Sequence, residues 1–421
     1  MSTAPVPMIR PRHRFARRTP MSRTILISGA SIAGPALAYW LHQHGMTATV
    51  IERAPELRPG GQTVDLRGAG RTVIERMGLE QAARDRVTHE EGMHFVDGRN
   101  RIRASFGTDS LDGDGFVTEL ELLRGELAGL LHQHTRDDVD YVFGDEITGL
   151  TDTSDGVDVT FRNGADRRFD LVILADGLRS RTRDLVFADI ARTRSFGLYT
   201  AYFTIPRAAS DGRWARWYNA PGRRVVLLRP DNQGTTRASL PFLYPQRGLE
   251  RLQAPAQQDF LRRHYADAGW ETPRVLDTMA DSPDFYFESI GQMHLKKWSR
   301  GRIAAVGDAA YCASPLSGMG TSLALVGAYI LAGELSRHTD HSDAFHAYEN
   351  LMRPYVAQAQ KVPWIAPRLA SPKTRTGIQL LNTIANLATN PKISRLATRF
   401  TNPPSDAINL PTYPHTQPTP P

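Results

Sequence analysis

Short apolar runs alternate with longer apolar stretches of helical spacing near the N-terminus. Thr24–Ser28 has the pattern of a buried strand, Pro35–His44 that of a helix, and Thr47–Glu52 that of a second strand ending in an acidic residue. Between the first strand and the helix lies a glycine-bounded tight turn, Gly29–Gly34. This order predicts a βαβ unit that binds a dinucleotide, with the pyrophosphate over the helix N-terminus and Glu52 on the adenosine ribose.

The turn departs from the usual fingerprint because Ser31 replaces the middle glycine. The added hydroxymethyl group either tightens the approach of the phosphate or donates a hydrogen bond to it. Taken alone, this turn also fits an ordinary strand-turn-helix. The acid at the end of the second strand favours the dinucleotide site.

A second segment of this kind lies further along the chain. The strand pattern Ile303–Val306 is followed by the glycine-spaced run Gly307–Gly320 and a long apolar helix, about Met319–Leu335. The carboxylate of Asp308, at the end of the strand, can accept a hydrogen bond from a ribityl or ribose hydroxyl. The helix start points free N–H groups at an anion or an electron-rich ring. Together they predict a cradle for the flavin end of FAD.

A third segment joins the apolar strand Asp170–Ala175 to the motif Asp-Gly-x-x-Ser-x-x-Arg, which runs from Asp176 to Arg183. A single Asp-Gly after a strand is usually a polar loop. Here it stands between the two cofactor segments with additional fixed spacing. With these three segments the chain resembles the single-component FAD-dependent aromatic hydroxylases, the para-hydroxybenzoate hydroxylase superfamily.

Within that superfamily, the segments GASIAGPALAYWL, VIERAPELRPGGQTVDL and AAVGDAAYCASPLSGMGTSLAL look most like the tetracycline-modifying and polyketide-tailoring monooxygenases. The resemblance runs from about Thr24 to about Leu335. It implies an α/β fold (α+β overall), with a Rossmann-like FAD-binding domain, a β-sheet substrate domain and C-terminal bracing helices. It also implies a monooxygenase that uses FAD, NADPH or NADH, and O2 to hydroxylate an aromatic, polyketide or tetracycline-like polycyclic substrate through a flavin hydroperoxide.

The resemblance assigns roles to individual residues. It places Glu52 on the ribose, Arg53 beside the adenine and Asp65 near the flavin, and it relates Arg58 to a nicotinamide-cofactor position across a one-residue difference in loop length. The residues expected at the cofactors are Gly29, Ser31, Ile32, Ala33, Gly34, Glu52, Arg53, Arg58, Asp65, Arg124, Asp176, Asp308, Pro315, Gly318, Met319 and Gly320. Relatives commonly have histidine at the position of Tyr311, so no role is given to an imidazole there.

Two arginines could serve either the cofactor or the protein structure. Arg124, in the helix-like stretch Glu121–Leu127, is expected to reach the ribityl-pyrophosphate region of FAD, and the alternative is a surface helix arginine in an i,i+4 pair. Arg183 is read as structural, tying the Asp176 loop to its neighbours.

The region between the cofactor segments predicts a second layer rich in strands and aromatic residues. A hairpin signal, Asp97–Asn100, joins Met93–Val96 to Arg101–Phe106. Further strand candidates are Leu198–Ile205, Arg216–Asn219, Arg223–Leu228, Thr235–Leu240 and Phe285–Glu288, with a helix at Gln257–Ala268. The aromatic residues either line a pocket for a planar substrate or fill a sheet–sheet core, and the sequence does not show which of them face the pocket.

These elements give a domain plan. The expected segments are a disordered basic leader (1–23), FAD-binding parts (24–92, 108–190, 291–340), a substrate-sheet hairpin (93–107), a substrate-binding sheet (191–290), C-terminal helices (341–400) and a disordered tail (401–421). Helical segments are expected at Ala344–Gln360 and Ile378–Leu387.

The positive charge is concentrated in the leader. The chain has a formal net charge of +7, and the six arginines of Met1–Arg23, with no acidic residue, reduce it to +1 when set aside. The leader suggests an upstream start codon, with Met21 as the functional start. The nearly neutral remainder argues against nucleic-acid binding, and no stretch is long and apolar enough to span a bilayer, so a soluble cytoplasmic protein, monomeric or weakly homo-oligomeric, is expected. The single cysteine, Cys312, excludes an intrachain disulfide framework, and it is read as a small buried residue rather than a redox thiol.

No nucleophile–base constellation, metal-ligand spacing or Walker loop is found, so no catalytic residue and no metal site are named. Alternatives on the same fold are a flavin-dependent halogenase, a reductase, or a non-catalytic flavin-binding module. Trp214 and Trp217 lie too far apart for the Trp-x-Trp-x-Ile-Pro element of tryptophan-type halogenases, which disfavours the first of these.

Overall fold

The computed structural model describes residues 23–58, 60–108, 118–389 and 407–414. Its first large sheet has the strand order β18-β19-β11-β1-β2-β7. The bounds are β1 Thr24–Ser28, β2 Thr47–Glu52, β7 Asp140–Phe143, β11 Leu171–Leu174, β18 Ser299–Arg300 and β19 Ile303–Ala305. All pairings are parallel except the short edge pair β18–β19. Such a sheet is covered on its faces, and its central strands are accordingly apolar and buried.

Helices enclose this sheet and make the main hydrophobic core. The longest of them are α1 Ala33–Gln43, α4 Arg124–Thr135, α9 Gly320–Arg337 and α10 His341–Ala359. Helix α9 is buried along nearly its whole length, between α1, α2 (Gly68–Arg76) and α10. This explains why its sequence is apolar on every face rather than on one stripe.

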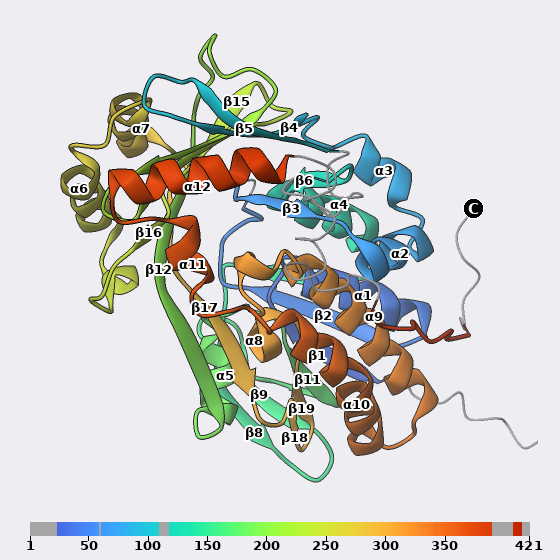
Figure 1. Ribbon diagram of the computed structural model, residues 1–421. Helices are drawn as coiled ribbons and strands as arrows, with labels where there is room; N and C mark the ends of the chain where they lie inside the picture. The colour runs from blue at the N-terminus through green and yellow to red at the C-terminus, as the bar shows by residue number, and fades with distance from the viewer. Residues whose placement is uncertain (1–22, 59, 109–117, 390–406, 415–421) are drawn as a thin grey trace, which may run out of the picture.

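The second large sheet contains the residues between the cofactor segments (Figure 1). Its eight strands are β4 Gly92–Val96, β5 Ile102–Gly107, β12 Ala191–Pro206, β13 Ala215–Ala220, β14 Arg224–Pro230, β15 Thr235–Ser239, β16 Phe242–Leu243 and β17 Tyr286–Leu295. The hairpin β4–β5 joins it through the parallel pair β4–β13. Helices α6 Ala254–Tyr265 and α7 Thr272–Thr278 lie beside it, and α12 Arg375–Ala388 packs on β5 and β13.

Smaller elements complete the fold. A three-stranded antiparallel sheet contains β8 Ile147–Asp152, β9 Val157–Phe161 and β10 Arg167–Phe169, and a ribbon pairs β3 Thr63–Asp65 with β6 Glu121–Leu123. Short helices are α3 Glu80–Arg84, α5 Arg181–Phe187, α8 Asp308–Tyr311 and α11 Ala366–Ala370. The predicted fold class, mixed α and β with an FAD-binding half and a sheet half, is confirmed.

Three local expectations were wrong. Glu121–Leu123 is a strand, and the helix begins only at Arg124, because these three residues pair with β3. Tyr413, in the tail expected to be disordered, is 2% exposed and donates a hydrogen bond to Glu334 at 2.6 Å. Arg23, assigned to the leader, donates to the carbonyl oxygens of Leu335 and His338. The remainder of the leader and residues 401–406 and 415–421 of the tail lie outside the described residues.

Candidate active site

The turn after β1 is a cradle that requires glycine at both ends. Gly29 has a φ of +112°, and a Cβ there would lie 2.6 Å from the carbonyl oxygen of Ala175. A Cβ on Gly34 would lie 1.9 Å from the carbonyl oxygen of Gly29, so even alanine would collide with the backbone. The turn therefore brings the start of α1 against the end of β1, and the first N–H groups of a helix have no partner within the helix. Such a helix start is an anion site.

Arg124 joins this turn from the start of α4. Its Nη1 donates a hydrogen bond to Oγ of Ser31 at 2.9 Å. A Cβ on Gly61 would come within 2.9 Å of Nε of Arg124, so the missing side chain at this position leaves room for the guanidinium. The alternative of a surface i,i+4 pair is thereby wrong. Because the Ser31 oxygen accepts from Arg124, its own O–H remains able to donate to a ligand.

The acidic end of β2 faces the same turn. Oε2 of Glu52 accepts from the N–H of Ala30, and Oε1 accepts from the N–H of Ala54, both at 3.0 Å. These bonds hold the carboxylate in place and leave each oxygen a second lone pair for a ligand hydroxyl. The neighbouring Arg53 is exposed.

The edge formed by β19, α8 and α9 lies close to the turn. Gly307, at a φ of +65°, has its Cβ direction blocked by the Cβ of Ala33, 3.1 Å away, so the two cofactor segments touch. Asp308 follows it, and Pro315 and Gly318 are exposed while Met319 is buried beneath them. Gly318 has a φ of +63° and Gly320 begins α9. This edge can offer a carboxylate and helix-start N–H groups to one ligand.

The Asp176 motif forms a compact loop between these edges. Oδ1 of Asp176 accepts from Ser180 Oγ at 2.5 Å, and burial raises the pKa of Asp176. Arg183 donates to the carbonyl oxygens of Leu178 and Ala309, at 3.0 and 3.3 Å, and is buried. The structural reading of Arg183 is confirmed, because this residue links the loop to α8.

Asp65 is held by protein partners in the β3–β6 ribbon. Its carboxylate accepts from Arg67 and from Thr118, both at 2.9 Å. Its charge also raises the pKa of the buried carboxylates of Glu90 and Glu121, though burial is the larger cause. The structure therefore surrounds Asp65 with a protein charge cluster, and its place near the flavin stays a prediction.

The face of the β12–β17 pair that adjoins the cofactor edge carries polar and aromatic side chains. Tyr202 stands opposite Tyr286, and Thr200 opposite Glu288, whereas Ala201 and Phe287 point into the sheet's own core. Burial raises the pKa of Tyr286 to about 12 although this side chain is 37% exposed. Tyr286 is thus partly exposed beside the cofactor half, and the open side of this face, next to Tyr286 and Glu288, is called the hollow below. These strands extend from the large sheet alongside the dinucleotide half (Figure 1).

Charged groups from the cofactor half change the pKa values of the side chains in this hollow. Burial raises the pKa of Glu288 to about 7, Arg179 and Arg124 lower it, and Asp308 raises it. Burial also raises the pKa of Asp308, which is nevertheless exposed. The charges of Arg179, Arg124 and Arg58 lower the pKa of Tyr286, though by less than burial raises it. The site therefore combines three arginines, two accessible carboxylates and two tyrosines.

Comparison with known proteins places this arrangement in a family. Residues 22–366 match the family described as FAD binding domain. A flavin-dependent monooxygenase from an unknown prokaryotic organism is 39% identical over 346 residues, covering 81% of this chain and 88% of that protein. A flavin-dependent monooxygenase of Legionella longbeachae is 36% identical over 344 residues, covering 80% and 87%. The crystal structure of tetracycline destructase Tet(51) aligns with a TM-score of 0.79 and 32% identity, covering 93% of this chain and all of that one.

The chain belongs to the FAD-binding family of flavin-dependent monooxygenases.

The residues of this monooxygenase fit FAD. The two glycines let the turn pack closely against the backbone of its neighbours, and its amides with Ser31 and Arg124 are the donors that a pyrophosphate requires. Glu52 and Asp308 stand at the two ends of the cradle as acceptors for hydroxyl groups. No group of three or more His, Cys, Asp or Glu side chains within the described ranges has the arrangement of a metal site.

Glu288 and Arg179 belong to this charged cluster but were not predicted from the sequence. Phe285–Glu288 was predicted as a strand, and its alternation of aromatic and polar residues would have placed Tyr286 and Glu288 on one face. Cys312 is buried, and burial raises its pKa, which agrees with the reading of a packed rather than a redox residue. None of the described helices is long and apolar enough to cross a membrane.

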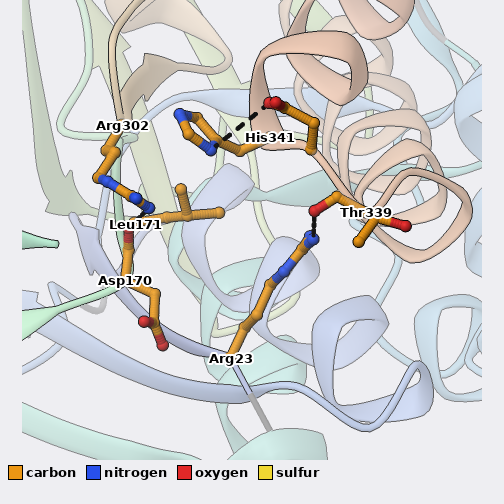
Figure 2. Close-up of a pocket in the computed structure, with 7 residues that line it drawn as sticks. Arg23, Asp170, Leu171, Arg302, Thr339 and His341 are labelled. Carbon is orange, nitrogen blue, oxygen red and sulfur yellow. Dashed lines mark hydrogen bonds and ion pairs between the residues drawn. The ribbon is translucent and has the colours of Figure 1, made fainter. Parts of the chain in front are cut away.

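A separate polar pocket of about 260 Å³ lies on the other side of the monooxygenase, at the N-terminal end of the parallel sheet (Figure 2). Arg23, Arg302 and His341 point into it, but Arg23 donates to the carbonyl oxygen of Thr339 and Arg302 to that of Asp170. Its cations are therefore already engaged in joining the helix ends to the sheet, and none of the residues predicted at the cofactors lines it.

Proposed function

We propose that this monooxygenase uses NADPH or NADH and O2 to hydroxylate an aromatic, polyketide or tetracycline-like polycyclic substrate. The observation that carries the proposal is the partly exposed, tyrosine-bearing face of β12 and β17, which packs beside α8 and whose Glu288 is influenced by Arg179, Asp308 and Arg124. A planar substrate fits between such a face and a flavin ring. The structural likeness to tetracycline destructases Tet(51) and Tet(55) supports a polycyclic substrate class.

FAD, when bound, supplies the redox and oxygen-transfer chemistry. The chain's own residues bind FAD and orient it. Arg124, Ser31 and the start of α1 would hold the pyrophosphate, and Glu52 and Asp308 the ribose and ribityl hydroxyls. The N–H groups at Gly318–Gly320 would stabilise negative charge beside the ring, as helix starts do. Asp176 supports the loop between these edges through Ser180.

Arg58 is our candidate for contact with the nicotinamide cofactor. It is exposed, and its charge acts on both Tyr286 and Arg124, which supports a position at the mouth of the hollow. A guanidinium there can meet a phosphate or ribose that approaches from solvent.

The test begins with purified protein. We expect yellow protein from which acid releases intact FAD, and NADPH oxidation that phenolic or polycyclic compounds accelerate. Mass analysis should find a product heavier by one oxygen atom. A colourless protein that no added FAD reconstitutes refutes the cofactor assignment, and stimulated NADPH oxidation with unchanged compounds throughout the screen favours the reductase alternative.

A further inference from the structure

Glu288 is a carboxylate that the fold turns toward the hollow rather than toward an ion-pair partner. Its cross-strand neighbour is Thr200, and its neighbours in sequence, Phe287 and Ser289, point to the opposite face of the sheet. Tyr286 Oη donates to Oε2 of Glu288 at 3.4 Å. Within the described part of the chain, Glu288 forms no ion pair. One carboxylate oxygen, Oε1, therefore remains for a ligand.

The charges around Glu288 select the kind of ligand. The groups that act on it are Arg179 from the loop after β11, Arg124 from α4, Asp308 from α8, and Tyr202, Tyr286 and Cys312. Arg179 is fixed beside the strand because its Nη2 donates to the carbonyl oxygen of Phe287 at 3.2 Å. With Arg58 at the mouth, the three arginines repel a cationic ligand. They favour a neutral donor that becomes an anion after it loses a proton.

The two tyrosines describe the shape of this ligand. Tyr202 and Tyr286 stand side by side on the face that carries Glu288. Aromatic side chains favour a flat partner. A flat, neutral molecule with an acidic hydroxyl is a phenol or an enol.

We propose that Glu288 is the hydrogen-bond and proton acceptor for a phenolic or enolic hydroxyl of the substrate. The inference rests on the proposed function and adds to it the residue that selects the substrate. In the step, the substrate O–H bond breaks, its electron pair stays on the substrate oxygen, and the proton bonds to Oε1 of Glu288. No electron is transferred to or from the protein. The resulting oxyanion faces the arginines and makes the adjacent ring carbons more electron-rich.

The acidity of Glu288 suits this step. Its pKa of about 7 puts the group close to equal populations of acid and base at neutral pH. A general acid or base works best when its pKa lies near the working pH. An ordinary exposed glutamate would be too weak a base to hold the proton.

The test uses calorimetric titration of the FAD-loaded protein with 2-naphthol and with 2-methoxynaphthalene, which has the same ring but no hydroxyl proton. For the wild type, the affinity for 2-naphthol should rise about tenfold between about pH 6 and pH 8, as Glu288 loses its proton. The methoxy compound should bind without this dependence. Glu288→Gln should bind 2-naphthol about tenfold more weakly at pH 8, with a flat pH profile. Glu288→Asp should restore the slope, and the control Ser289→Ala, on the opposite face, should behave as the wild type.

Four results would overturn the inference. They are a persisting slope in Glu288→Gln, the same slope with the methoxy compound, no saturable binding of either naphthalene, and loss of FAD from Glu288→Gln, which would put the residue on the cofactor. Failure of the proposed function would look different. Wild-type protein without FAD would refute that function, while calorimetry of the same apoprotein still reports whether Glu288 binds the hydroxyl.

Discussion

Two groups of buried acids in this molecule have opposite surroundings. Glu90 and Glu121 share Arg229, whose guanidinium makes two bonds to Glu90 at 2.9 and 3.0 Å and lies 2.6 Å from Glu121. The side chains of Glu90 and Glu121 are 0% and 3% exposed. Surrounding protein also raises the pKa of Glu288 and of Asp308. These two residues are nevertheless partly exposed or exposed, and neither forms an ion pair within the described ranges.

The difference separates structural charge from functional charge. Burial alone would lower the pKa of Arg229, yet Glu121 and Glu90 raise it above its ordinary value, so this cation stays charged. It joins β14 of the large sheet to β6 of the ribbon and to the chain before β4. The acids of the hollow have no such partner, and their desolvation is a cost that a ligand can offset. Strongly perturbed groups in a hollow are candidates for function.

The largest expected effect is a loss of stability when the buried Arg229–Glu90–Glu121 cluster is broken. Arg229→Met should lower the free energy of unfolding by about 3–5 kcal/mol, because it leaves two buried carboxylates without their cation. Urea denaturation followed by circular dichroism would measure it. The control Arg168→Met removes exposed surface pairs with Asp158 and Asp155 and should leave the urea midpoint nearly unchanged. Equal losses in the two variants would contradict the distinction drawn here.

Asp308 should show the reverse behaviour. Asp308→Ala removes an acceptor at the cradle, which should weaken FAD binding by about one to two orders of magnitude. The stability of the apoprotein should stay the same or rise, since burial disfavours the charged carboxylate. Fluorescence titration of apoprotein with FAD gives the first quantity, and urea denaturation the second. Asp308→Asn, which keeps an acceptor oxygen, is the matched control and should bind FAD more tightly than the alanine variant.

How much of this contrast the sequence could predict depends on the range of the interactions. The Gly29 turn, Asp308 and the Arg183 tie follow from local spacing, and strands β1 and β2 have the predicted bounds. The pairing of Arg229 with Glu90 and Glu121 joins residues more than a hundred positions apart, and no local pattern indicates it. The same holds for Tyr413, which packs where Gly333 leaves no side chain. Glu288 lies between these cases, since its own strand and Leu198–Ile205 were both predicted as strands but their pairing, which sets the face of Glu288, was not.

Substitution of Arg58, at the proposed mouth of the hollow, should have a smaller effect, on the KM for NADPH. Arg58→Ala should raise the KM for NADPH about three- to tenfold and leave the flavin spectrum unchanged, because it loses one charged contact to a transient ligand. Steady-state oxidation of NADPH at saturating FAD measures it, and Arg58→Lys, which keeps the charge, should recover part of the loss. Apoprotein from Arg58→Ala would instead place this arginine on FAD.

The smallest expected effect is a pH-dependent change in stability at Glu288. In the folded protein its pKa is raised from 4.5 to about 7, so the folded state binds the proton more tightly than the unfolded state. The wild-type apoprotein therefore loses stability as the pH rises from about 4.5 through 7, and the loss is complete above 7. Glu288→Gln cannot ionise, so its thermal midpoint should exceed that of the wild type by about 1–3 °C at pH 8 and match it near pH 4, below the unfolded-state pKa. Asp137→Asn changes the same charge on a side chain that is 87% exposed, and its difference from the wild type should not grow with pH in this way. If differential scanning fluorimetry finds the two variants parallel across this range, then Glu288 is no more perturbed than a surface acid and does not belong with the acids of the hollow.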